Sequence, residues 1–342
     1  AYTNTRRAAS MSETELPTPS IPEGYNICLR GFADEDVARK LGNDVGNYLR
    51  SLSRFIDVSN LDGLTVAYDY AQALLELDRG YETTRQLTAS SGDAIGVAMT
   101  PSVIRNGKLR SHIVINGGLA EYLSDPKGEH FDLALHTLAH ECAHVEVTNR
   151  FDEAFPNTLL QKSYGTYVEA LQWEVILACW DEYAVCRICA RIGAEPTNGY
   201  EEVFLGQLES APEAAKNSII EYRIHGDLDR MLAEVLGAYG NLMKFASYHI
   251  GNLRGLDIAI DDRERTNSAL SGHWFEPFFC RLADIHDKLF AQYGVWQDKA
   301  DFEAIGALAQ SVLAERGVII RPEGDNYYVD VPFSPETMPL FS

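Results

Sequence analysis

The sequence HTLAHECAH, residues 136–144, contains the motif H-E-x-x-H, formed by His140, Glu141 and His144. Two histidines four positions apart lie on the same side of an α-helix, about one turn from each other, so both imidazoles can reach one metal ion. Two neutral imidazoles suit zinc, and they leave room for a third protein ligand and a water molecule. The motif therefore predicts a zinc site on a helix, with His140 and His144 as ligands.

The setting of the motif favours a metal site over the alternative, in which the histidines are hydrogen-bonded core residues. Residues 131–149 have the periodicity of an amphipathic helix, and a β-branched segment at 112–116 precedes them and predicts a strand. Glu141 projects beside the histidines, where its carboxylate can take a proton from a water molecule and pass it to a leaving group. We therefore expect Glu141 to be the catalytic general base.

Helical and strand periodicities around this helix predict an α+β fold. Expected strands cover residues 64–68, 94–99 and 112–116, and an Asn-Gly pair at 106–107 favours a hairpin or a close pair of strands. Expected helices cover residues 34–55, 70–79, 131–149, 166–192, 201–209, 212–223, 227–250, 276–293 and 300–316. Residues 318–321 and 327–331 predict a terminal β-hairpin. The sequence thus predicts a small N-terminal sheet with helices, then a large helical C-terminal part and the hairpin.

We expect three segments along the chain. Residues 1–22 are rich in Thr, Ser, Ala and Pro and predict a disordered leader, which lacks the apolar core of a secretory signal. Residues 23–150 predict an α/β part that ends with the H-E-x-x-H helix. Residues 151–342 predict a mainly helical part that supplies the third metal ligand, and the two parts can equally form one continuous unit.

The composition and net charge of the chain disfavour some classes of binding partner. The chain has 342 residues, of which 46% are hydrophobic and 23% charged, so it can bury a substantial core. Its formal net charge of −21 disfavours nucleic acid and anionic membrane surfaces as partners. No apolar run reaches the roughly 18 residues that span a bilayer. The six cysteines do not form the pattern of a disulfide framework, which favours reduced thiols and a cytoplasmic location.

The strand, the H-E-x-x-H helix and a later helix with an acidic residue resemble the zincin metallopeptidases, and a glutamate as third ligand resembles their gluzincin branch. The segment WDEYAVCR, residues 180–187, resembles the glutamate-bearing helix of small cytoplasmic zincin-like proteins. The resemblance covers residues 94–192. Val147 and Arg150 replace the Gly and His of the metzincin extension. The resemblance implies a zincin-type active-site helix and peptidase-type hydrolysis.

The third metal ligand is expected on the helix at 166–192. This helix is apolar nearly all round, so a lone carboxylate on it would be costly unless a cation met it. Its central acids are Glu174, Asp181 and Glu182, and helical geometry alone does not decide between the two adjacent ones. The resemblance to the zincin-like helix and the longer reach of glutamate favour Glu182. The alternative role for Glu182 is an ion pair with Arg187 or a satisfied buried acid.

Other polar residues are candidates for supporting roles. His136 is eight residues from His144, about 12 Å along the helix axis, so both cannot bind one ion, and His136 is expected to pack or to donate a hydrogen bond near the site. A hydrolase of this kind also needs a donor for the oxyanion of its transition state. Tyr183, His225 and Tyr248 are candidates, each with a structural role as the alternative.

Two further patterns predict structure rather than chemistry. Cys186 and Cys189 form C-x-x-C deep inside an expected helix, which favours buried core cysteines over a redox pair or a second zinc site. The charge run at 261–265 predicts a solvated loop.

These observations together predict a zinc-dependent metallopeptidase that acts on a peptide or protein. A substrate peptide could add as a strand beside residues 113–115. One alternative is a non-catalytic binding or regulatory protein on a zincin scaffold, which Glu141 argues against because a structural zinc site has no use for a base. The other alternative is a zinc hydrolase of a non-peptide amide. The sequence predicts no oligomeric state.

Overall fold

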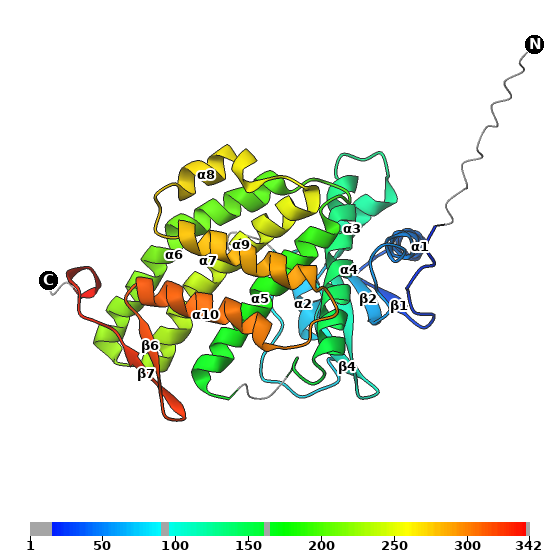
Figure 1. Cartoon of the computed structure of the whole chain (residues 1–342). Helices are drawn as coiled ribbons and strands as arrows, with labels where there is room; N and C mark the ends of the chain where they lie inside the picture. The colour runs from blue at the N-terminus through cyan, green and yellow to red at the C-terminus, as the bar shows by residue number, and fades with distance from the viewer. Residues whose placement is uncertain (1–15, 90–95, 161–164, 340–342) are drawn as a thin grey trace, which may run out of the picture.

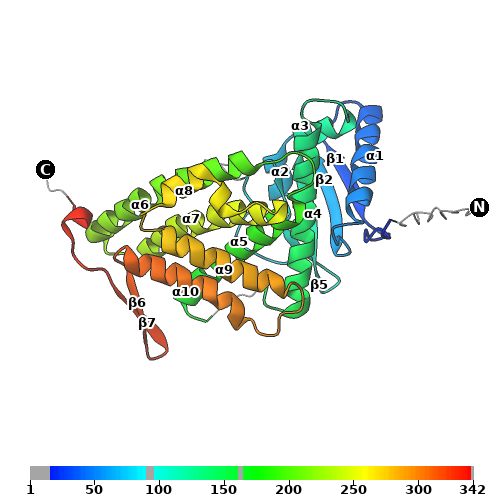
Figure 2. The ribbon, with the colours of Figure 1, turned by 45° about the horizontal axis from the view of Figure 1, so that its top comes forward.

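The computed structural model describes residues 16–89, 96–160 and 165–339. Most of the leader expected at 1–22 therefore lies outside the described residues. The views in Figures 1 and 2 show one long helix, α4 (Phe131–Ala154), between two layers. The small sheet and α1 (Glu35–Leu52) lie on one side of α4, and the helices from α5 to α10 lie on the other. The fold is α+β, as the sequence predicts.

The sheet is mixed. Its strands β1 (Asn26–Arg30), β2 (Leu61–Ala67) and β5 (Lys108–Asn116) run parallel, in that order. On the other side of β5, the strands β3 (Ala98–Met99) and β4 (Ser102–Arg105) pair with it antiparallel. The sequence analysis missed β1 and β4. The Asn-Gly turn is where it was expected, with φ of 52° and 74° at Asn106 and Gly107, but it joins β4 to β5 rather than 94–99 to 112–116.

The position of β5 corrects one expectation. Ile113 and Ile115 pair with Leu64 and Val66 of β2, and β5 also pairs with β3 and β4 on its other edge. The expectation that a peptide adds beside residues 113–115 is therefore wrong, because the backbone groups of an interior strand are already bonded. Within the described residues, β3 and β4 each pair only with β5, so the two short strands together form the edge of the sheet on this side.

Most expected helices are present at nearly the expected bounds. They are α2 (Tyr70–Leu75), α5 (Tyr167–Cys189), α6 (Thr197–His225), α7 (Leu228–Leu256), α9 (Glu276–Ala291) and α10 (Ala300–Glu315), and the terminal hairpin is β6 (Ile319–Glu323) with β7 (Asn326–Asp330). The two helices expected at 201–209 and 212–223 form the single α6, which tolerates Pro212 inside it. Short helices that the sequence analysis missed are α3 (Gly117–Ala120), α8 (Glu264–Leu270), and the 3-10 turns η1 (Glu121–Ser124), η2 (Ile260–Asp262) and η3 (Pro335–Thr337).

The charge run at 261–265 is mostly exposed, as expected, but it is not an irregular loop, and one of its side chains has a buried partner. It covers the end of η2 and the beginning of α8. The guanidinium of Arg263 donates to Glu201 Oε2 at 2.5 Å, and Glu201 is fully buried. A buried carboxylate needs a partner, and the run supplies it.

The hydrophobic core is continuous through both layers. Buried residues of one cluster extend from Leu41 on α1, through Leu138 on α4, to Leu313 on α10. The helix α4 contributes residues to this core on the side of the sheet and on the side of the later helices. No helix among the described residues is long and apolar enough to cross a membrane.

The helices α5 and α7 pack unusually close together because α7 carries glycine at the contact. A Cβ atom added at Gly251 would lie 2.3 Å from the carbonyl oxygen of Tyr183 on α5, and one at Gly255 would lie 2.4 Å from that of Arg187. Both distances are far below van der Waals contact, so only glycine permits this approach. The close packing sets the position of the middle of α5.

We expect Gly251→Ala to lower the free energy of unfolding by about 1–3 kcal/mol, because the new methyl group forces α5 and α7 apart. Gly237→Ala is the matched control on the same helix, since a Cβ there meets nothing within 4 Å. That control should be more stable by about 0.5–1 kcal/mol through helix propensity. Urea unfolding of both variants checks the prediction, and equal stabilities would contradict it.

Candidate metal centre

The helix α4 holds the two histidines of the motif edge to face, at an interplanar angle of 78°, with their Nε2 atoms close together. His140 Nε2 lies 3.1 Å from His144 Nε2, and the side chains are only 13% and 14% exposed. A ligand atom of Glu141 lies within 4.8 Å of both rings. Residues four apart on a helix are neighbours on one face, which accounts for the pairing. The three motif residues therefore form a group that could hold a metal ion.

Glu182 on α5 completes a triangle of ligand atoms with the two histidines. Its Oε2 lies 3.6 Å from His140 Nε2 and 3.8 Å from His144 Nε2. A tetrahedral zinc ion with bonds of about 2.0–2.1 Å separates its ligand atoms by about 3.3–3.4 Å. The observed separations of 3.1, 3.6 and 3.8 Å are close to that value. The donor set is thus of the right size for one ion.

The same oxygen of Glu182 needs a cation. Oε2 is buried and has no hydrogen-bond partner among the described residues. Burial raises the pKa of Glu182 to about 7, although the His144 ring opposes the change. An unpaired carboxylate oxygen in the interior is costly, and a bound metal ion would remove that cost. The residues present therefore fit a metal ion on an observation that is independent of the motif.

Asp181 has a different role from its neighbour. Its Oδ2 lies 2.8 Å from His144 Nδ1, the ring nitrogen that faces away from Glu182. This contact holds a proton on Nδ1 and so makes Nε2 the nitrogen that faces the triangle, as carboxylates commonly do for metal-binding histidines. Burial alone would lower the pKa of His144, but Asp181 and Glu182 raise it to about 10, so the ring without an ion is protonated and a metal ion that binds Nε2 displaces a proton.

The third acid on α5 lies elsewhere. Glu174 is exposed and pairs with Arg85 at 3.1 Å. Glu182 is therefore the acid of α5 that faces both Nε2 atoms, whereas Asp181 binds only the far side of one ring. The alternative role for Glu182, an ion pair with Arg187, is absent from the described contacts, since Arg187 binds Asp287 of α9 at 3.2 Å.

Glu141 is buried and oriented by a residue from the sheet. Its Oε2 accepts a hydrogen bond of 2.7 Å from the hydroxyl of Thr100, the residue that follows β3. Burial raises the pKa of Glu141, and Thr100 and His144 partly oppose this. The sequence analysis missed Thr100, for which no local pattern gives a signal. The contact brings the edge strand of the sheet against the candidate base.

Two tyrosines adjoin this group. The ring of Tyr248 on α7 stacks on His140, with centroids 6.0 Å apart and an interplanar angle of 12°, and its hydroxyl lies against the Glu182 carboxylate. Tyr70 begins α2 and is 6% exposed, with a buried hydroxyl that has no hydrogen-bond partner among the described residues. Burial and the Glu141 charge together raise the pKa of Tyr70. Tyr248 was among the expected candidates, and Tyr70 was not.

The other expected supporting residues lie away from the triangle. Tyr183 donates to Asp287 Oδ1 at 2.8 Å and stacks on His286, so its hydroxyl points to α9. His225 is exposed at the end of α6, where its Nδ1 accepts from the backbone of Asp227. The structure does not bring either residue to the histidines.

His136 and Cys189 form a second group around His140. His136 Nδ1 bonds the carbonyl oxygen of Ile192 at 2.9 Å, which is the packing role expected for it. Cys189 is fully buried, as expected, but its Sγ also lies 3.9 Å from His140 Nδ1. The sequence did hold a signal for this contact, because Cys189 is seven residues after Glu182 and therefore on the same face of α5. His136, His140 and Cys189 could also hold a metal ion.

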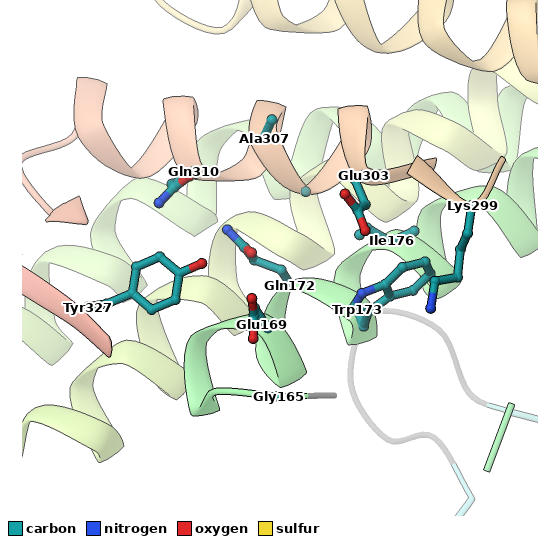
Figure 3. Close-up of a pocket in the computed structure, with 11 residues that line it drawn as sticks. Gly165, Glu169, Gln172, Trp173, Ile176, Lys299, Glu303, Ala307, Gln310 and Tyr327 are labelled. Carbon is teal, nitrogen blue, oxygen red and sulfur yellow. The ribbon is translucent and has the colours of Figure 1, made fainter. Parts of the chain in front are cut away.

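A cavity of about 490 Å³ lies at the other end of α5 (Figure 3). It is lined by Glu169 and Gln172 of α5, Glu303 and Gln310 of α10, and Tyr327 of β7. None of the residues in the two metal-binding groups lines it. The cavity is therefore separate from the candidate metal centre.

Comparison of this chain with models of known protein families, with curated proteins and with solved structures finds no match. The interpretation of the site therefore rests on its geometry and on the sequence motif.

Substitution of the acids on α5 should separate their roles. With Zn²⁺ as the probe ion, Glu182→Gln should lower affinity more than about 100-fold, and Asp181→Asn by about 10–100-fold, the usual effect of losing an orienting carboxylate. Glu174→Gln is the control with the same loss of charge on the same helix, and it should leave affinity unchanged. Competition with a zinc chelator gives the affinities. Equal effects of Glu174→Gln and Glu182→Gln would contradict the assignment.

Proposed function

We propose that this protein is a zinc-dependent hydrolase of peptide bonds, with a zincin-like active site on α4 and α5. The observation that carries the proposal is the buried Oε2 of Glu182, which has no hydrogen-bond partner in the described part of the chain and lies opposite the two Nε2 atoms of His140 and His144. The donor set of two imidazoles and one carboxylate is that of a catalytic zinc site, which keeps a position for water. A purely structural zinc site has four protein ligands and no adjacent base.

His140, His144 and Glu182 would hold the zinc ion, which when bound lowers the pKa of a water molecule and polarises a carbonyl group. Glu141 then takes the proton of the attacking water and delivers it to the nitrogen of the leaving amine. The hydroxyl of Thr100 bonds Glu141 Oε2 at 2.7 Å and keeps the carboxylate in one orientation. Glu141 is buried, so bulk water does not compete for that proton.

The edge strand β3 supports a peptide or protein as the substrate. Thr100 joins β3 to the candidate base, so a chain that added to the free edge of β3 would pass Glu141. Strand addition supplies main-chain hydrogen bonds without a demand on side chains. This replaces the interior strand β5 as the surface for the substrate.

Tyr70 is the group best suited to the oxyanion of the transition state. Its hydroxyl is a buried donor that has no hydrogen-bond partner among the residues that the structure describes, and α2 packs against Met99, the residue before Thr100. Donors that are already oriented stabilise developing charge without reorganisation. Tyr248 is less suited, because its hydroxyl lies against Glu182.

The first alternative is a zincin-scaffold protein without catalysis, and the second is a zinc hydrolase of a non-peptide amide. The buried Glu141 and its Thr100 contact disfavour the first, because a binding protein does not need an oriented base. Cleavage of a peptide library by the zinc-loaded protein, with the metal-stripped protein as control, distinguishes all three. Cleavage that depends on zinc supports the proposal, and its absence would contradict it.

Glu141→Gln should leave about one zinc ion per chain, because residue 141 is the base rather than a ligand. Peptide hydrolysis should fall by roughly 10²–10⁴-fold, the contribution of general-base catalysis. Glu153→Gln on the same helix is the control, since Glu153 is half exposed and pairs with Arg150. Elemental analysis and the cleavage assay check both variants. Loss of zinc from Glu141→Gln would show that Glu141 is a ligand.

Tyr70→Phe should leave zinc content and the KM for peptide nearly unchanged and lower kcat by about 10²–10³-fold, as for one oxyanion donor. The matched control is Tyr328→Phe on the terminal hairpin, where the residue is exposed. Steady-state kinetics of both variants provide the test. Full kcat in Tyr70→Phe would remove this residue from the mechanism.

A further inference from the structure

His140 has a second ring nitrogen, and that nitrogen faces sulfur. Nε2 belongs to the triangle with His144 and Glu182, whereas Nδ1 lies 3.9 Å from Cys189 Sγ. His136 stands one turn earlier on α4, and the ligand atoms of all three residues lie within 4.8 Å of one another. Two different sets of donors therefore share one imidazole.

The second set of donors is His136, His140 and Cys189, and hydrogen bonds decide which nitrogen atom of His136 carries a lone pair. The backbone carbonyl of Ile192 accepts a hydrogen bond from His136 Nδ1 at 2.9 Å, which fixes the proton there and leaves a lone pair on Nε2. The contact of Nε2 is a long one, 3.4 Å to the hydroxyl of Tyr200. The thiol of Cys189 is fully buried beside these rings. His136 Nε2 and His140 Nδ1 thus have long contacts, 3.4 Å to Tyr200 and 3.9 Å to Cys189 Sγ, and both can bind a metal ion in place of these contacts.

The chemistry of this set differs from that of the triangle. Two imidazoles and a carboxylate suit zinc, whereas two imidazoles and a thiolate form the donor set of protein copper sites. Three ligands without a carboxylate suit Cu⁺, which accepts a trigonal arrangement and a soft sulfur atom. A buried site also excludes the water that harder ions retain.

We propose that His136, His140 and Cys189 form a second metal site, selective for Cu⁺. Binding replaces the S–H proton of Cys189 with a Cu–S bond, and the proton passes to the buffer. Copper enters and remains as Cu⁺, so no electron is transferred. The two imidazoles bind through their lone pairs as neutral ligands.

The shared ring makes the two metals compete. His140 Nε2 carries the lone pair when the ring serves the triangle, and Nδ1 must carry it when the ring serves Cys189. One neutral imidazole cannot offer both lone pairs at once. Cu⁺ should therefore displace zinc from the triangle and inhibit any activity that depends on zinc.

The test uses the full-length protein with Cu⁺ supplied anaerobically against a chromophoric Cu⁺ chelator. The wild type should bind one equivalent, with sulfur scattering at the copper X-ray absorption edge, and should lose zinc as it does so. Cys189→Ser and Cys189→Ala should each weaken Cu⁺ binding more than about 100-fold and keep zinc. Cys280→Ser is the control, because Cys280 is an exposed thiol on α9.

The remaining outcomes separate this site from the proposed function. Glu182→Gln should lose zinc but retain Cu⁺, and loss of both ions would place copper in the triangle and overturn the inference. Survival of tight Cu⁺ binding in both folded Cys189 variants, or no binding by the wild type, would also overturn it. The buried thiols of Cys142 and Cys186 are the other sulfur donors nearby, and dependence on either one instead of Cys189 would do the same. A wild type that binds Cu⁺ through Cys189 but never binds zinc would contradict the proposed function alone.

Discussion

A carboxylate from one helix meets two imidazoles from another in the interior of this protein, and much of the architecture serves that contact. The Oε2 atom of Glu182 is buried and has no hydrogen-bond partner within the described ranges, which costs free energy in the absence of a cation. The Glu182 carboxylate keeps this buried position only if α5 cannot rotate about its own axis. The close approach of α7, through Gly251 and Gly255, fixes the middle of α5 and so fixes the carboxylate.

The two histidines of the motif are supported differently. His144 is oriented by Asp181, whose contact with Nδ1 makes Nε2 the nitrogen that faces the triangle. His140 is bordered by the ring of Tyr248 and by the thiol of Cys189, neither of which carries a charge that would fix its proton. His140 is therefore the adaptable ligand, and the difference between the two rings explains how one cluster can offer both an oxygen-containing and a sulfur-containing donor set.

The sequence analysis was accurate where nearby residues decide the structure of an element, and it failed where residues far away in the sequence decide it. Helices such as α4 and α5 are long and buried on most sides, and they were predicted to within a few residues. The strand β1 was missed because it is an edge strand without a buried residue, and its sequence NICLR contains only one β-branched residue. The charge run at 261–265 is mostly exposed, as expected, but the role of Arg263 was missed because its partner, Glu201, lies far away in the sequence. A local pattern carries no information about such a partner.

Several features of the candidate centre follow from local spacing alone. The pairing of His140 with His144, the place of Glu141 beside them and the presence of two adjacent acids on a buried helix all follow from helical periodicity. Periodicity acts within one helix, so it does not set how α5 is rotated against α4. That rotation, decided by side chains and glycines of α7, directs Glu182 to both Nε2 atoms and Asp181 to Nδ1. Tyr70, Thr100 and Cys189 reach the centre for the same reason, since only packing between distant segments brings them there.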